Sequence, residues 1–283
     1  MATAESQTQT PTLSGPPRFN AASATDIGRR RTQNQDSLAF CPELGLFVVA
    51  DGMGGHQGGE TASAMAVEII PEELKKFRQY ANWEPHEAIT RAIRAANDAI
   101  FDRATQNSTL RGMGTTVTAL LFAGDRLVIG HVGDSRGYFF RPIPPDYAVS
   151  DEAERYPIWQ ATRDHSLVQE KLRAGLITRA QMRTDRMKNV ITRSVGFDKN
   201  LNVETYELQV KPGDAFLICS DGLSGQMQDL EIRQVIDEHL HKNHDAEAAV
   251  KKLIEIANKN GGDDNITSIL VEVVSLPGEP NTV

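Results

Sequence analysis

With only two cysteines, Cys41 and Cys219, far apart in 283 residues, the chain has no disulfide framework. It also lacks any run of the roughly 18 apolar residues that a membrane-spanning helix needs. Positive charge is in deficit, because 30 Lys and Arg residues face 38 Asp and Glu residues, which gives a net charge of −8. Nucleic acids and anionic membranes attract proteins through cationic contacts, so we expect neither as a partner. These absences predict a soluble, reduced, cytoplasmic protein.

The ends of the chain have the composition of unfolded segments. Residues 1–20 are rich in Thr, Ser, Gln and Pro, cannot bury enough apolar surface to fold, and lack the basic and apolar regions of a signal peptide. We therefore expect residues 1–20 to be a disordered tail and residues 276–283 to be a flexible one. Between them, residues 21–275 contain no repeat and no linker, which predicts a single folded domain. Within it, the proline-rich stretch 141–160 is expected to be a surface insertion or mobile loop.

Hydrophobic periodicity predicts the fold class. Apolar runs indicate buried strands, an alternating run indicates a half-exposed strand, and apolar residues at three-to-four spacing indicate helices. The strands are expected at residues 46–50, 116–123, 127–132, 203–210, 215–219 and 266–274, and the helices at 60–77, 89–100, after 164 and at 229–240. Pro71 is expected to break or kink the first helix. Because the strands come in clusters rather than in strict βαβ alternation, we expect an α+β protein with layered antiparallel sheets.

Aspartates stand at the ends of the predicted strands. Three apolar runs end at an aspartate, a fourth begins just after one, and another aspartate precedes a further apolar patch; in chain order these residues are Asp36, Asp51, Asp134, Asp221 and Asp264. A single Asp-Gly after a strand is usually only a turn, but the repetition suggests carboxylates that converge on one rim. Such a cluster repels itself unless cations neutralise it. Oxygen ligands without His or Cys favour Mg²⁺ or Mn²⁺, and two such ions can activate a water for attack on phosphorus.

These aspartates lie within seven short motifs that extend over roughly residues 23–274. In chain order the motifs are Arg31-x-x-Asn34-Gln-Asp36-Ser, Asp51-Gly-Met-Gly-Gly, Gly114-Thr-Thr, Gly133-Asp-Ser-Arg136, Asp164-His-Ser, Ser220-Asp-Gly-Leu and Asp264-Asn-Ile-Thr. The ordered set resembles the metal-dependent protein phosphatases of the protein phosphatase 2C family, in its bacterial branch. The resemblance implies a central β-sandwich of two antiparallel sheets flanked by α-helices, in four αββα layers, with a binuclear metal centre at one end. It also implies a variable flap around residues 141–200.

The resemblance assigns metal-binding roles to the aspartates. It implies that Asp51 bridges two Mg²⁺ or Mn²⁺ ions and that the Gly52 carbonyl completes one of the sites. The three remaining positions of this centre, which bind the metals directly or through water, are Asp36, Asp221 and Asp264. Asp134 matches the ligand of a third, weaker ion, which it shares with Asp221.

Arg31 matches the arginine that binds the substrate phosphate in the family, a task that suits the bidentate, permanently charged guanidinium. The residues alone do not distinguish it from its neighbours Arg29 and Arg30. Met53 stands where eukaryotic members have a histidine that is often assigned as the general acid, and methionine cannot donate a proton. We therefore expect a water of the metal site, His165 or His56 to protonate the leaving oxygen.

Two functions remain open at this level. The first is an enzyme that hydrolyses phosphoserine and phosphothreonine in proteins, by attack of a water that bridges two metal ions, and that opposes a bacterial Ser/Thr kinase. We expect such an enzyme to be a monomer whose partners are phosphorylated proteins. The second is a noncatalytic binding module that keeps the fold and recognises a partner through residues 141–200. Such a module is expected to have lost its bridging carboxylates, and this sequence retains all of them.

Overall fold

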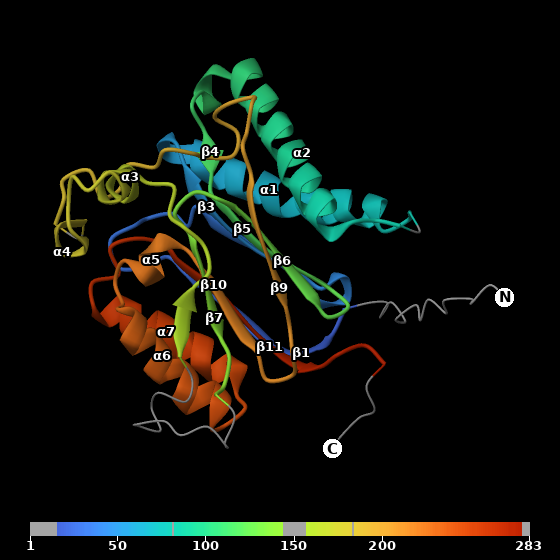
Figure 1. Cartoon of the computed structure of the whole chain (residues 1–283). Helices are drawn as coiled ribbons and strands as arrows, with labels where there is room; N and C mark the ends of the chain where they lie inside the picture. Colours follow the sequence, from blue (N-terminus) through green and yellow to red (C-terminus); the bar gives the residue numbers. More distant parts are fainter. Residues whose placement is uncertain (1–15, 81, 144–156, 183, 279–283) are drawn as a thin grey trace.

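A computed structural model of the chain describes residues 16–80, 82–143, 157–182 and 184–278. Two antiparallel sheets lie face to face in the middle, and pairs of helices cover their outer faces (Figure 1). The expected four-layer α+β sandwich is thereby confirmed. In the described part of the chain, no helix has the length and apolar character needed to cross a membrane.

The two sheets are assembled from strands that are far apart in the sequence. The first has the order β1 (Arg18–Asp26), β11 (Ile266–Ser275), β10 (Ala215–Cys219), β7 (Arg136–Phe140) and β8 (Ile158–Gln160). The second has the order β2 (Asp36–Cys41), β3 (Leu46–Met53), β5 (Val117–Ala123), β6 (Arg126–Val132) and β9 (Glu204–Gln209), with β4 (Gly114–Thr115) paired to β3. The predicted strands therefore form, with ends shifted by at most a few residues.

Both faces of the central strands are buried, which explains their continuous apolar runs. In β3, Phe47 and Val49 point between the sheets, whereas Leu46, Val48 and Ala50 belong to the core beneath the helices. Aromatic rings fill the space between the sheets, and the ring centroids of Phe122 and Phe216, from opposite sheets, are 5.6 Å apart.

Each sheet carries two main helices on its outer face (Figure 1). These are α1 (Gly55–Phe77) and α2 (Pro85–Gln106) on the second sheet, and α6 (Asp229–Ile236) and α7 (Ala246–Lys259) on the first. The predicted apolar face of α2, from Ile89 to Ile100, is buried as expected. The predicted break at Pro71 does not occur, because α1 continues through it with Ile70 and Leu74 fully buried against the core. Helix α7 was not predicted.

Smaller elements complete the described chain. They are the 3₁₀ turns η1 (Pro42–Leu44) and η2 (Ser108–Leu110), the short helices α3 (Leu167–Arg173), α4 (Arg179–Met182) and α5 (Asp221–Ser224), and the π-helical turn Asp237–His241 after α6. A capping box begins α4, because the Thr178 backbone N–H donates to Gln181 at 2.8 Å and the Gln181 N–H donates to the Thr178 hydroxyl at 3.4 Å.

Two predicted boundaries need correction. Residues 18–20, assigned to the disordered tail, belong to β1, because Phe19 packs between the sheets with its ring centroid 5.3 Å from that of Phe47. The segment 141–160, expected to be irregular, includes the edge strand β8, whose Trp159 stacks on Phe139 at 5.4 Å. Residues 1–15, 144–156 and 279–283 lie outside the described residues, so the predictions for them stay predictions.

Candidate metal centre

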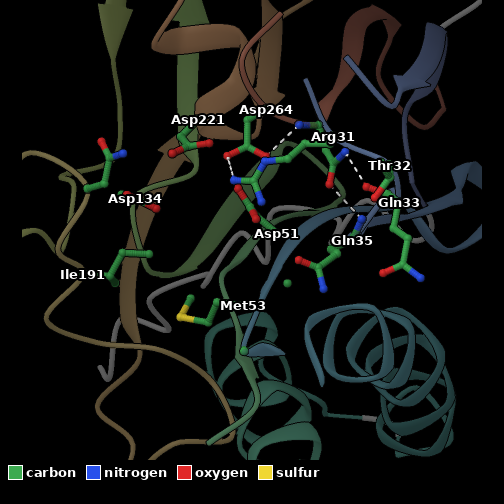
Figure 2. Close-up of a pocket in the computed structure, with 14 residues that line it drawn as sticks. Arg31, Thr32, Gln33, Gln35, Asp51, Met53, Asp134, Ile191, Asp221 and Asp264 are labelled. Carbon is green, nitrogen blue, oxygen red and sulfur yellow. Dashed lines mark hydrogen bonds and ion pairs between the residues drawn. The ribbon is translucent and has the colours of Figure 1, made fainter. Parts of the chain in front are cut away.

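The strand-end aspartates meet at one end of the sandwich. Asp36 and Asp51 are directly opposed in the pair β2–β3. Asp134 follows β6, Asp221 begins α5 just after β10, and Asp264 lies two residues before β11. Four of these carboxylates, all except that of Asp36, line one cavity of about 500 Å³ together with Arg31 and Met53 (Figure 2). The sheets therefore place side chains from across the sequence around a single space.

Asp36 lies behind the cavity wall. It is buried, and its Oδ2 accepts a hydrogen bond of 2.7 Å from the Ser220 hydroxyl, which in turn accepts one of 3.0 Å from the Thr267 N–H. The Oδ1 atoms of Asp36, Asp134 and Asp221 are buried and have no hydrogen-bond partner within the described residues. Buried carboxylate oxygens are normally satisfied, so these three atoms suit a cation that approaches from the cavity.

The burial of these groups disfavours their ionised form. Desolvation raises the pKa of Asp36 to about 7 and that of Asp134 to about 8, and the charge of Asp221 adds to both effects. Burial followed by the charge of Asp264 raises the pKa of Asp221 to about 6. Burial also raises the pKa of Asp51 well above its ordinary value, with Asp36 as the strongest neighbouring charge. Without cations, the cluster holds protons that ordinary aspartates release.

The donor set fits a hard divalent cation. Within the residues that the structure describes, no three Asp, Glu, His or Cys side chains lie close enough together to bind a metal ion without other ligands. Mg²⁺ is usually bound by only one or two carboxylates and keeps several waters, so carboxylates that face an open cavity meet its requirements. Among the described residues, neither histidine nor cysteine lines the cavity, which disfavours Zn²⁺.

These pKa values predict how pH affects stability. A raised carboxyl pKa means that the folded protein holds more protons than the unfolded chain between pH of about 4 and about 8, from the ordinary value of 3.8 to that of Asp134. In EDTA, the melting temperature is therefore expected to fall as the pH rises through this range. Mn²⁺ replaces the protons, so it should raise the melting temperature more at pH 8 than at pH 5.5. Differential scanning calorimetry measures the melting temperature with Mn²⁺, with NaCl of the same ionic strength as the control. An equal rise in melting temperature at both pH values would contradict the prediction.

Backbone contacts hold Asp51 in place. The Thr116 hydroxyl accepts from the Asp51 N–H at 2.9 Å, and the Thr115 hydroxyl donates to the Asp51 carbonyl at 2.9 Å. Gly52 packs so closely on the Gly59 backbone that a Cβ at Gly52 would lie 2.1 Å from the Gly59 carbonyl oxygen. Both threonines belong to the Gly114-Thr-Thr motif, but no pattern in that motif indicates that they hold Asp51.

Arg31 reaches the cavity from the loop between β1 and β2. Asn265 holds this loop, because its Oδ1 accepts from the Gln35 N–H at 2.8 Å and its Nδ2 donates to the Gln33 carbonyl at 2.9 Å. The Arg31 guanidinium donates to Asp264 Oδ2 at 2.5 Å, and both side chains point into the cavity (Figure 2). Arg30 instead pairs with the exposed Asp263 at 3.8 Å. The structure therefore distinguishes Arg31 from its neighbours, as the residues alone could not.

His165 is not among the residues that line the cavity. Its side chain is buried, its Nδ1 accepts from the Gly133 N–H at 3.0 Å, and its Nε2 lies 3.3 Å from Glu204 Oε1. Burial lowers the pKa of His165, which favours a neutral ring whose Nε2–H donates to Glu204. This geometry supports a positioning role, in which His165 fixes the turn that carries Asp134, rather than the predicted proton transfer. The side chain of the other histidine considered, His56, lies outside what the structure describes.

A leaving-group comparison separates the two roles of His165. A positioning residue should affect all substrates alike, so His165→Asn is expected to lower turnover of phenyl phosphate and of p-nitrophenyl phosphate by the same factor, roughly tenfold. A proton donor should matter only for phenyl phosphate, whose leaving group is the stronger base. A selectively larger loss with phenyl phosphate would restore the proton-donor role.

The chain is similar in sequence and in fold to known proteins. A family model described as protein phosphatase 2C matches residues 27–271. The serine/threonine phosphatase stp of Listeria monocytogenes is 33% identical over 258 residues, which cover 90% of this chain and 96% of that protein. The crystal structure of the Mycobacterium tuberculosis serine/threonine phosphatase PstP/Ppp has a TM-score of 0.78 and 31% identity, covering 90% of this chain and 99% of that one. A structure of the PstP catalytic domain in complex with two manganese ions has a TM-score of 0.76 and 31% identity, over 91% and 99% of the respective chains.

Proposed function

Because the chain belongs to the protein phosphatase 2C family, we propose that it hydrolyses phosphoserine and phosphothreonine in proteins with the help of Mg²⁺ or Mn²⁺. The observation that carries this proposal is the cavity of about 500 Å³ in which four carboxylates face one guanidinium. The buried, unpartnered oxygens of Asp134 and Asp221 support a cation there, and Arg31 supports an anionic substrate. The two manganese ions of the related PstP catalytic domain agree with this choice of metal.

The positions of the carboxylates support a separate role for each. We propose that two ions would be held by Asp51, shared between them, with the Gly52 carbonyl, Asp221 and Asp264, and that Asp134 with Asp221 would hold a weaker third ion. Asp36, which lies behind the wall, would act through water. When bound, the two ions supply charge neutralisation and an activated water for attack on phosphorus.

The rest of the chemistry belongs to protein side chains. Arg31 binds two phosphate oxygens and orients the phosphoryl group, and its ion pair with Asp264 keeps the guanidinium at the cavity before substrate arrives. Met53 faces the cavity and cannot donate a proton. His165 does not line the cavity, and its Nδ1 accepts a hydrogen bond from the Gly133 N–H. We therefore propose solvent as the source of the proton for the leaving serine or threonine oxygen.

The biological setting is proposed from the relatives alone. The relatives stp and PstP are named serine/threonine phosphatases, so phosphorylated proteins are the proposed partners. We also propose a bacterial Ser/Thr kinase as the opposing enzyme, a monomeric state, a cytoplasmic location and a role in signal transduction.

The proposal is tested by phosphate release from a phosphothreonine peptide, measured with Mn²⁺, with Mg²⁺ and with EDTA. Hydrolysis that depends on the metal supports the enzyme. Tight binding of the peptide without release of phosphate, under all three conditions, would favour the noncatalytic binding module instead.

A further inference from the structure

A second cavity, of about 660 Å³, lies at the end of α2, where the segment that leads into β9 passes beside the helix (Figure 1). Its wall is mixed: Phe101 and Ala104 from α2 and Phe197 from the segment before β9 form an apolar part, and polar residues form the rest. Arg111 adds one positive charge; it is exposed, and among the described residues no ion pair holds it. The cavity therefore combines aromatic surface with an available cation.

The backbone around Phe197 is tied to α2, although Phe197 itself is 69% exposed. Asn97 of α2, only 1% exposed, accepts from the Gly196 N–H at 2.7 Å and donates to the Asp198 carbonyl at 3.0 Å. One buried amide thus ties the backbone on both sides of Phe197. Gly196, with φ +92°, packs where a Cβ would lie 2.1 Å from Ile100. Because this backbone is already held, ordering it costs little when a partner covers the exposed ring.

The second cavity adjoins the metal-centre cavity. Gly54, which lines the first, lies against the backbone of Gly112, which lines the second; a Cβ at Gly54 would be 2.9 Å from the Gly112 carbonyl oxygen. On the other side, Ile191 lines the first cavity and Gly196 the second. The five positions from Ile191 to Gly196 span at most about 17 Å even when the chain is fully extended. A substrate peptide of similar length can therefore reach from one cavity to the other.

We propose that the second cavity binds the phosphoprotein substrate itself, by taking a large apolar side chain that has an acidic neighbour, about three to five positions from the phosphorylated residue. The apolar side chain packs on Phe197 and Phe101, and the acidic one pairs with Arg111. The inference rests on the proposed phosphatase activity and adds a substrate preference to it. Phe197 and Arg111 are then specificity-determining residues rather than catalytic ones.

The test compares phosphothreonine peptides with p-nitrophenyl phosphate, which is too small to occupy both cavities. The peptides carry Leu-Glu or Ala-Ala at each position from three to five, on either side of the phosphothreonine. The wild type is expected to prefer one Leu-Glu peptide in kcat/KM by roughly tenfold, the scale of one buried aliphatic side chain. Phe197→Ala and Arg111→Ala should each remove most of this preference and change kcat/KM for p-nitrophenyl phosphate by less than about twofold. The control is Tyr80→Ala. Tyr80 is 68% exposed and follows the C-terminal end of α1, whereas Gly54, beside both cavities, precedes the N-terminal end.

The outcomes separate this inference from the proposed function. Activity toward p-nitrophenyl phosphate with no preference among peptides, or with a preference that both variants retain, would overturn the inference alone. Equal losses on both substrates would show that Phe197 and Arg111 support the fold, and would overturn it too. An inactive wild type would overturn the proposed function and, with it, this inference.

Discussion

Asp51→Asn is expected to lower turnover of p-nitrophenyl phosphate by at least about a thousandfold, or about 4 kcal/mol of activation free energy. Asp51 lies opposite Asp36 in the β2–β3 pair and is within hydrogen-bond reach of Asp221, so it is the carboxylate best placed to serve two cations at once. Asparagine has nearly the same shape but no negative charge, and the ions should bind far more weakly. Turnover at saturating Mn²⁺ and titration calorimetry of Mn²⁺ check the two parts of this prediction.

The stability of Asp51→Asn distinguishes loss of function from loss of fold. Burial raises the pKa of Asp51, so the metal-free protein carries an unfavourable group there that asparagine makes neutral. In EDTA at pH 8, the variant should melt at the same temperature as the wild type or higher. The control is Asp102→Asn, at an exposed position of α2, which should leave turnover unchanged. Full activity of Asp51→Asn, or a loss explained by unfolding, would contradict the role assigned to Asp51.

Arg31→Ala is expected to lower kcat/KM for phosphate monoesters by roughly a hundredfold, because a preorganised charged donor to the reacting phosphoryl group is removed. Arg31→Lys should recover only part of the loss, since an ammonium cannot form two parallel hydrogen bonds to phosphate. Steady-state kinetics with p-nitrophenyl phosphate, and inhibition by inorganic phosphate, measure both effects. Affinity for phosphate should fall together with kcat/KM.

The neighbouring arginine provides the matched control. Arg30 is exposed, pairs with Asp263 and does not line the cavity, so Arg30→Ala should change kcat/KM by less than about twofold. Equal effects of the two substitutions would indicate that the basic loop acts through its net charge alone. That result would remove the specific role of Arg31.

The strand-end aspartates could be found in the sequence because each marks the point where a buried apolar run reaches solvent. Antiparallel packing then places those ends on one rim, so the location of the cavity followed from local patterns. The same local patterns could not predict which strands pair, because pairing depends on contacts between residues that are far apart in the sequence. Arg18–Asp26 pairs with the last strand across more than two hundred positions, and that pairing brings the partly buried Phe19 against Phe47.

The supporting contacts of the site could not be predicted for the same reason. Asn265 bonds the loop of Arg31, and Ser220 bonds Asp36, across separations of 230 and 184 positions. His165 stands in a motif, but only the structure shows that the Gly133 N–H occupies its Nδ1. Phe197 offered no periodic signal, because the Asn97 contacts that hold it are side-chain bonds to irregular backbone.

The most direct test of the metal centre is anomalous diffraction from crystals grown with Mn²⁺ and measured on both sides of the manganese edge. We expect two strong anomalous peaks in the cavity, both adjacent to Asp51, with Asp221 and Asp264 beside them. A third, weaker peak near Asp134 is expected at high Mn²⁺ concentration. Crystals of active protein with no manganese peak in this cavity would contradict the proposed metal centre.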